Sequence, residues 1–146
     1  MEHRKGFSLI ELIIVIAVIG ILGSMSSYAW QHQRDNTNLR AAARGMMADI
    51  ASCKQRAMAE GTPYRINITK NTSTYTISQS PFISMETKDL NIFGSGLYIP
   101  TNNKQLDFRT RGTVSTGTIN IKNSVGSTAK ITINITGRAD VQFAMR

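Results

Sequence analysis

The N-terminal stretch limits what this chain can fold into more than any other part of the sequence does. A short basic leader ending in Lys5-Gly6 precedes an apolar run from Phe7 to Leu22, and that run contains one carboxylate, Glu11. An acidic side chain at the centre of a membrane helix costs about 2.5 to 3.5 kcal/mol, so an acid in such a run indicates a functional site. Because a buried charge without a partner is unfavourable, we expect Glu11 to have one.

The apolar run and the residues that follow it are long enough to cross a bilayer once. Residues 7–30 contain no charged side chain besides Glu11, and about 20 apolar residues suffice for a membrane-spanning helix. The short segment before the run is basic, which by the positive-inside rule keeps the N-terminus in the cytoplasm. We therefore predict a leader over 1–6 and a transmembrane half-helix over 7–30, with the rest of the chain on the opposite side.

A second half-helix is predicted over residues 31–61. Apolar residues recur there at steps of three and four, which is typical of an amphipathic helix. Gly61 and Pro63, the first proline of the chain, supply a C-terminal stop. The predicted apolar stripe consists of Leu39, Ala43, Met46, Met47, Ile50, Cys53, Ala57 and Met58. We expect this stripe to pack as a core face, although its methionines also suit an adaptable binding surface.

From residue 62 onward the apolar period changes to two, with many β-branched residues, which favours strands. Such runs occupy residues 64–69, 75–77, 106–108, 118–121, 131–135 and 140–143, with turn residues between them. Residues 80–103 have no clear period, and we expect irregular strands and surface loops there. The predicted fold class is α+β, a long N-terminal helix packed on a small antiparallel β-rich head over 62–146.

Residues that would carry catalysis or bind a metal are sparse. His32 stands alone, and Cys53 is the only cysteine, so no intramolecular disulfide can form. A buried apolar role for Cys53 is favoured over a reactive or intermolecular thiol. We expect no catalytic residues, no cofactor and no metal site, and the chain is not predicted to be an enzyme.

The N-terminal motif resembles the class III signal of type IV prepilins and pseudopilins, because the basic leader, Gly6, Phe7 and Glu11 all occur in register. The resemblance implies that a prepilin peptidase cuts between Gly6 and Phe7 and that Phe7 is then N-methylated. It also implies that Glu11 pairs with the N-terminal amine of a neighbouring subunit during assembly. The implied location is the bacterial inner membrane, followed by a filament.

Two other interpretations of this stretch were weighed. An ordinary cleaved secretory signal has a small-residue cleavage site after its apolar core, and residues 23–29 could loosely provide one, but Glu11 inside the core argues against it. A plain signal anchor that happens to contain a glutamate is the second alternative. It would leave a lone membrane-anchored domain without filament partners.

Further segments look like the FimT/GspH group of minor pilins and pseudopilins. These segments are residues 39–44, 56–63, 107–112 and 135–138. Major pilins commonly carry a proline in the middle of the long helix, and this chain has none before Pro63. The resemblance implies a structural minor subunit of a type IV pilus or of a type II secretion pseudopilus, with other pilin-like subunits as partners.

A basic head leaves DNA open as a partner. Residues 62–146 carry ten Lys and Arg against four Asp and Glu, a balance that favours polyanions. Some FimT-type minor pilins are implicated in DNA uptake through a Gly-Arg-x-Arg motif, whereas the corresponding residues here are Gly137-Arg138-Ala139-Asp140. The candidate DNA contacts are Arg109, Arg111, Arg138 and Arg146. The structural alternative is a solvated basic surface, or salt links to neighbouring subunits.

Overall fold

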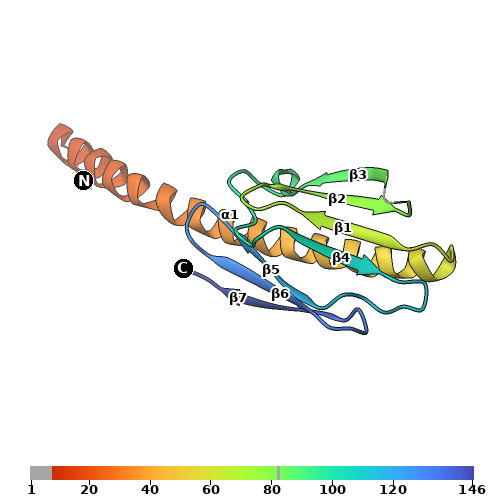
Figure 1. Cartoon of the computed structure of the whole chain (residues 1–146). Helices are drawn as coiled ribbons and strands as arrows, with labels where there is room; N and C mark the ends of the chain where they lie inside the picture. The colour runs from red at the N-terminus through yellow and green to blue at the C-terminus, as the bar shows by residue number, and fades with distance from the viewer. Residues whose placement is uncertain (1–7, 82) are drawn as a thin grey trace, which may run out of the picture. The chain divides into compact units, whose positions relative to one another are not determined.

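The computed structural model describes residues 8–81 and 83–146, except for the side chains of residues 25–29. Gly6 and Phe7, the predicted cleavage and methylation positions, lie outside the described residues, as does the leader. One long helix, α1, runs from Leu9 to Ala59 (Figure 1). The chain divides into two compact units, Met1–Arg34 and Asp35–Arg146, and the boundary between them falls inside α1.

The second half of α1 ends where the sequence analysis places the stop. The Glu60 amide still donates to the Arg56 carbonyl oxygen at 2.9 Å. Gly61 then takes a φ of +63°, in the left-handed region that glycine adopts at little cost. The helix cannot continue through that residue, and the chain turns into the first strand.

In the part of the chain that the structure describes, seven antiparallel strands form two sheets. The first sheet has the order β3-β2-β1-β4 and the second the order β5-β6-β7. The strand bounds are β1 Tyr64–Ile68, β2 Thr74–Gln79, β3 Ile83–Asp89, β4 Lys104–Phe108, β5 Gly117–Lys122, β6 Thr128–Ile133 and β7 Ala139–Ala144, and one short 3-10 helix, η1, covers Leu90–Ile92. The antiparallel β-rich head and the long N-terminal helix confirm the predicted α+β class.

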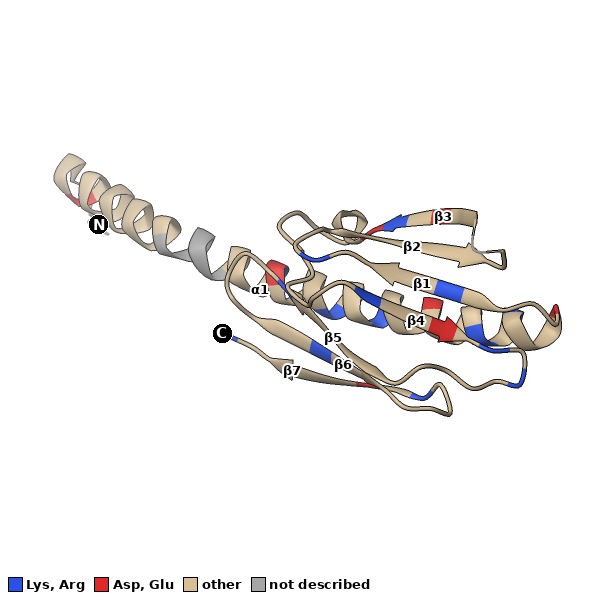
Figure 2. Cartoon of the chain, in the orientation of Figure 1, with Lys and Arg blue, Asp and Glu red and all other residues tan. Residues whose placement is uncertain are grey.

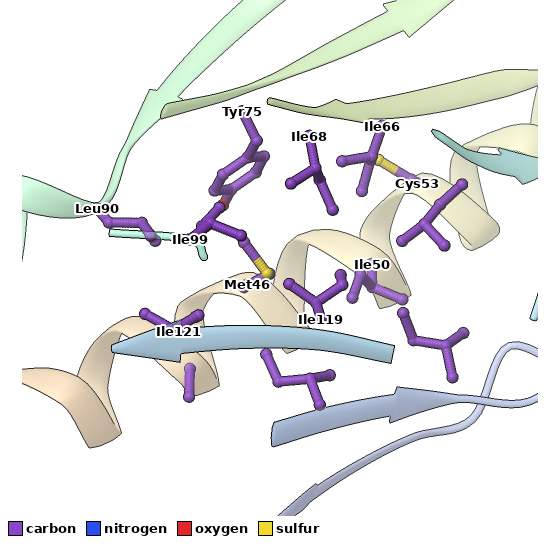
Figure 3. Packing of buried hydrophobic residues seen from close by; sticks show 14 of the residues in the cluster. Met46, Ile50, Cys53, Ile66, Ile68, Tyr75, Leu90, Ile99, Ile119 and Ile121 are labelled. Atoms are coloured by element: carbon purple, nitrogen blue, oxygen red, sulfur yellow. The ribbon is translucent and has the colours of Figure 1, made fainter. Parts of the chain in front are cut away.

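The helix stripe and both sheets share one apolar core, shown in Figure 3. Met46 and Ile50 of α1 lie among Ile66 of β1 and Ile119 of β5, all at most 1% exposed. Burying an aliphatic side chain of this size contributes about 1.5 to 3 kcal/mol. The fully or nearly buried helix residues are Leu39, Ala42, Ala43, Met46, Ile50, Cys53 and Ala57. The amphipathic half of α1 is therefore the central element of the head.

The expected composition of the stripe was wrong at two positions. Met58 is 53% exposed, although the stripe included it, whereas Ala42, which the stripe omitted, is fully buried. Within residues 80–103, where irregular strands and surface loops were expected, residues 83–89 form the strand β3, and its register against β2 shifts between Ile77 and Ser78. Ile83 and Met85 alternate with Ser84 and Glu86 in the sequence, but six residues of β3 are exposed and Lys88 is half-buried, so this alternation marks no buried face. β3 is ordered by its pairing with β2.

Candidate functional site

The first part of α1 exposes apolar side chains along its length. Between Leu9 and Leu22 the large apolar residues are 45 to 75% exposed. A continuous apolar surface of this kind marks a contact with another protein or with lipid. Within the residues that the structure describes, no helix combines the length and the apolar character that a membrane crossing requires. The transmembrane half-helix over 7–30 stays a prediction.

Glu11 lies in the first turn of α1, on the exposed apolar segment. Its backbone amide donates to the Ser8 carbonyl oxygen at 3.0 Å, as expected at a helix start. Among the described residues its carboxylate has no hydrogen bond or ion pair. A carboxylate in the first turn interacts favourably with the helix dipole and stabilises the helix by about 0.3 to 1 kcal/mol. The geometry leaves its oxygens open to a group from outside the described chain.

Three of the four candidate arginines lie at one end of the head, on two turns that meet at Lys54. Arg109 and Arg111 are on the turn after β4, and Arg138 is on the turn before β7. Lys54 of α1 donates from Nζ to the Thr136 carbonyl oxygen at 2.6 Å. The backbone at Gly112 also approaches the Lys54 side chain, because a Cβ there would lie 3.6 Å from Cε. Basic residues near this end of α1 are visible in Figure 2.

Arg146 lies apart from the other three arginines. Its amide donates to Ser127 Oγ at 2.9 Å, beside the first residue of β6, whereas Arg138 precedes Ala139, which pairs with Ile133, the last residue of that strand. Five residue steps along β6 span about 17 Å. The structure therefore does not bring the four candidates into one patch. Arg138 also lies beside Asp140, with Nε 3.6 Å from Oδ1, which offsets part of its charge.

The acidic side chains of the head are already engaged. Arg65 Nε lies 2.5 Å from Asp107 Oδ1, and Lys88 Nζ lies 2.7 Å from Glu86 Oε1. Asp89 accepts from the Asn91 amide at the start of η1, at 2.9 Å. With these acids paired, the remaining lysines and arginines dominate the surface charge of the head.

Lys122 and Lys130 are two such cations that the sequence analysis did not single out. They occupy outward positions of β5 and β6, opposite to the buried Ile121, Ala129 and Ile131. Their alternation with core residues was visible in the sequence. That pattern alone does not distinguish a functional lysine from a solvated one, because every half-buried strand has a polar side.

Cys53 shows the features of a structural thiol. It is 2% exposed, and burial, reinforced by the charge of Asp49, raises its pKa from 9.0 to about 12. The neighbouring Tyr75 hydroxyl donates a hydrogen bond to the Asp49 carboxylate, and burial together with that bond raises the tyrosine pKa. Among the described residues, no group of three His, Cys, Asp or Glu side chains is arranged to hold a metal ion.

Comparisons with known proteins found a sequence motif, a curated relative and solved structures that are similar to this chain. Residues 1–27 match the prokaryotic N-terminal methylation motif. Type II secretion system protein H of Xanthomonas campestris pv. campestris is 34% identical over 67 residues, which cover 46% of this chain and 40% of that protein. The chain thus matches less than half the length of this curated relative.

Two solved structures share the fold of the head. The minor pseudopilin EpsH from the type 2 secretion system of Vibrio cholerae matches with a TM-score of 0.59 and 15% identity, over 72% of this chain and 96% of that chain. The type IV minor pilin FimU of Pseudomonas aeruginosa matches with a TM-score of 0.54 and 19% identity, over 71% and 87%. This chain joins an N-terminal methylation motif of the type IV prepilin kind to a head with the fold of minor pseudopilins and minor pilins.

Proposed function

We propose that this protein is a structural minor pilin or pseudopilin subunit of a type IV pilus or of a type II secretion pseudopilus. The observation that carries the proposal is the methylation motif over residues 1–27 on a chain whose head has the minor pseudopilin fold. The prepilin enters the inner membrane with its N-terminus in the cytoplasm, and its head faces the periplasm. After processing, the exposed apolar residues of α1 supply the contacts with other subunits in the filament.

Processing is the first step that can be tested. The prepilin peptidase cuts after Gly6 and methylates the new N-terminal amine on Phe7. Intact-mass and peptide mass spectrometry of the protein made in a host with that peptidase should find a chain beginning with methylated Phe7. A Gly6→Val variant should keep the full leader, since a branched side chain replaces the small residue at the cut. A mature protein that still begins at Met1 contradicts the processing step.

Assembly depends on Glu11 in this proposal. In the filament its carboxylate pairs with the N-terminal amine of a neighbouring subunit, which offsets the cost of placing either charge among apolar side chains. Glu11→Ala should leave membrane insertion intact and abolish incorporation into sheared filaments or crosslinked assemblies. Glu11→Asp keeps the charge and should retain part of the incorporation. Incorporation of Glu11→Ala at the level of the unchanged protein would remove this role.

The cluster of Arg109, Arg111, Arg138 and Lys54 supports a second candidate, a DNA-binding minor pilin of an uptake pilus. Three arginines on two turns, with Lys54 of α1 between those turns, can contact neighbouring phosphates, and such binding falls steeply with salt. A gel-shift titration with duplex DNA at low and high salt tests it, with Arg109→Gln/Arg111→Gln as the weakened variant. If micromolar protein shows no salt-sensitive shift, the DNA role is excluded.

A further inference from the structure

The outer face of the β5-β6-β7 sheet, which points away from α1, contains a groove. Because side chains alternate along a strand, the residues between the buried isoleucines of β5 and β6 point outward. One hollow of about 490 Å³ is lined by Pro100, Asn120, Lys122, Thr128, Lys130, Gln142, Phe143 and Ala144. A second hollow of about 410 Å³ shares Lys122, Thr128 and Ala144 with it and extends to Arg146. The two form one continuous surface, here called the outer groove.

One wall of the outer groove is fixed to the sheet. The segment Tyr98–Thr101 runs along β5, where the amide and carbonyl groups of Tyr98 and Lys122 exchange hydrogen bonds of 3.0 and 2.9 Å. The Asn120 amide donates to Thr101 Oγ1 at 2.8 Å. Because these bonds hold the wall in place, the groove exists before any ligand arrives, and little ordering is required on binding.

The charged side chains that line the outer groove all have the same sign. Lys122, Lys130 and Arg146 line it, and no Asp or Glu is among the residues that line either hollow. Among the described residues, none of the three cations has an ion pair within the chain. Three unpaired cations around one groove attract a ligand with several negative charges.

The neutral lining suits a peptide better than a nucleic acid. Asn120, Gln142 and Thr128 offer both donors and acceptors, as an extended backbone requires. The one aromatic residue of the lining, Phe143, is half-buried, with the Arg40 guanidinium 5.9 Å from its ring centroid. Single-stranded nucleic acids bind best where open aromatic faces stack on bases. The groove offers hydrogen bonds and charge without such a platform.

An open strand edge adjoins the groove. β7 pairs with β6 on one side, and no described strand pairs with its other side. The Asn134 amide donates to the Arg138 carbonyl oxygen, so by the alternation of an antiparallel ladder Ala139, Val141 and Phe143 direct their backbone groups to the open edge. An extended segment can add to this edge and place alternate side chains over the groove.

A second copy of this chain is a poor occupant. Its nine acidic residues are scattered, and nowhere do two of them stand side by side in the sequence. The chain as a whole carries a formal charge of +8, so two copies repel each other. An acidic segment must therefore come from a different protein.

We propose that the outer groove binds an extended acidic segment of a different protein, whose carboxylates meet Lys122, Lys130 and Arg146 while its backbone adds to the open edge of β7. This site goes beyond filament assembly and does not depend on it. A failure of the Glu11 experiment therefore leaves the groove proposal standing, and a failure at the groove leaves the subunit proposal standing.

The test uses the full chain in an uncharged detergent and a fluorescent peptide of alternating Glu and Thr. Fluorescence anisotropy at low and high salt measures the dissociation constant. Lys122→Gln/Lys130→Gln removes two groove cations, and Arg44→Gln/Lys70→Gln removes the same charge from two exposed positions outside both candidate sites. All four side chains are at least partly exposed, so both variants should keep the circular dichroism spectrum and melting temperature of the unchanged protein. Two further ligands are measured in the same way. One is a neutral peptide of alternating Gln and Thr, and the other is a single-stranded oligonucleotide with the same net charge as the acidic peptide.

We expect the acidic peptide to bind and the neutral peptide to bind much more weakly. The groove variant should weaken acidic-peptide binding about fivefold at low salt, since each exposed charge contact contributes about 0.2 to 1 kcal/mol. The matched variant should weaken it less than about twofold. Equal losses in the two variants, or no binding of the acidic peptide, would overturn the proposal. If the oligonucleotide binds more tightly than the acidic peptide and the groove variant abolishes that binding, the proposal is overturned in favour of a nucleic-acid site.

Discussion

The environment of Cys53 keeps its sulfur neutral and unreactive. The side chain is 2% exposed, and the nearby Asp49 carboxylate adds to the effect of burial in raising the thiol pKa to about 12. A thiolate is the reactive form of cysteine, so this residue is a poor nucleophile at neutral pH. Of the two roles weighed for Cys53, the buried apolar one agrees with this environment.

The raised pKa of Cys53 predicts a loss of stability in alkali. In the unfolded chain the thiol ionises near 9.0, whereas in the folded protein it stays protonated to about pH 12. The stabilisation is therefore complete below pH 9.0 and declines as the pH rises toward 12, because the unfolded state binds fewer protons there. Between pH 9 and pH 10 the thiol should lower the free energy of unfolding by about 1 kcal/mol.

Urea unfolding followed by circular dichroism at pH 8, 9 and 10 measures this loss. The matched control is Cys53→Ala, which lowers stability at every pH by removing buried volume but lacks the thiol titration. Tyr64 and Tyr75, whose pKa values are also raised, start from an ordinary value of 10.0. They therefore contribute mainly above the window used. Parallel pH profiles for the two proteins would contradict the assignment.

At the scale of single elements, the cost of replacing a turn glycine depends on which atoms a Cβ at that position would meet. Gly137 has a φ of +75°, and a Cβ there would lie 2.7 Å from Lys54 Cδ and 2.9 Å from Val114 Cγ2. Gly61 has a φ of +63°, but nothing lies within 4 Å of a Cβ at that position. Both residues adopt the left-handed backbone region. Of the two, only Gly137 also lies where a Cβ would clash with neighbouring side chains.

This contrast predicts different costs for two identical substitutions. Gly61→Ala should lower the free energy of unfolding by about 1 kcal/mol, from backbone strain alone. Gly137→Ala should cost about 2 to 4 kcal/mol, because strain adds to a clash that displaces Lys54 or Val114. Urea unfolding of both variants by circular dichroism provides the measurement. Equal losses would show that the Gly137 turn relaxes freely.

The sequence predicted the elements that carry a strong period and not those that lack one. The stripe from Leu39 to Ala57 marks the helix because every third or fourth residue enters the core. The strands β1 and β6 alternate between buried and outward side chains, so their pattern is readable. β3 has no buried face although Ile83 and Met85 alternate with polar residues, and it holds its place by backbone pairing with β2. A hydrogen-bond ladder leaves no hydrophobic signature.

The candidate sites likewise divide into residues that the local sequence marks and groupings that only the fold creates. Glu11 could be singled out as a candidate because a single charge in an apolar run is visible in the sequence itself; its role stays a prediction. The arginines were identifiable as cations, but their grouping depends on which turns meet, and the contact of Lys54 with Thr136 is a long-range fact of the fold. The outer groove likewise needs Tyr98–Thr101 to run beside β5, and neither local period nor composition encodes that arrangement.

The buried core and the exposed apolar residues occupy different parts of the whole molecule. Every buried apolar residue of the described core lies between Leu39 and Ile133, and partly buried side chains from Ala139 to Met145 pack against it, whereas the large apolar side chains between Leu9 and Leu22 are exposed. The unit Asp35–Arg146 therefore contains the complete apolar core. Removing the first part of α1 takes away an interaction surface and leaves that core intact.

A chain truncated to residues 33–146 should therefore fold by itself. We expect cooperative urea unfolding, with a midpoint close to that of the full chain in an uncharged detergent, because the same side chains are buried in both. Truncation to residues 48–146 is the matched control. It removes Leu39, Ala43 and Met46, each fully buried, and so should lose several kcal/mol and unfold without a sharp transition. If residues 33–146 also lack a cooperative transition, the exposed part of α1 contributes to the stability of the head, and the separation of the two roles fails.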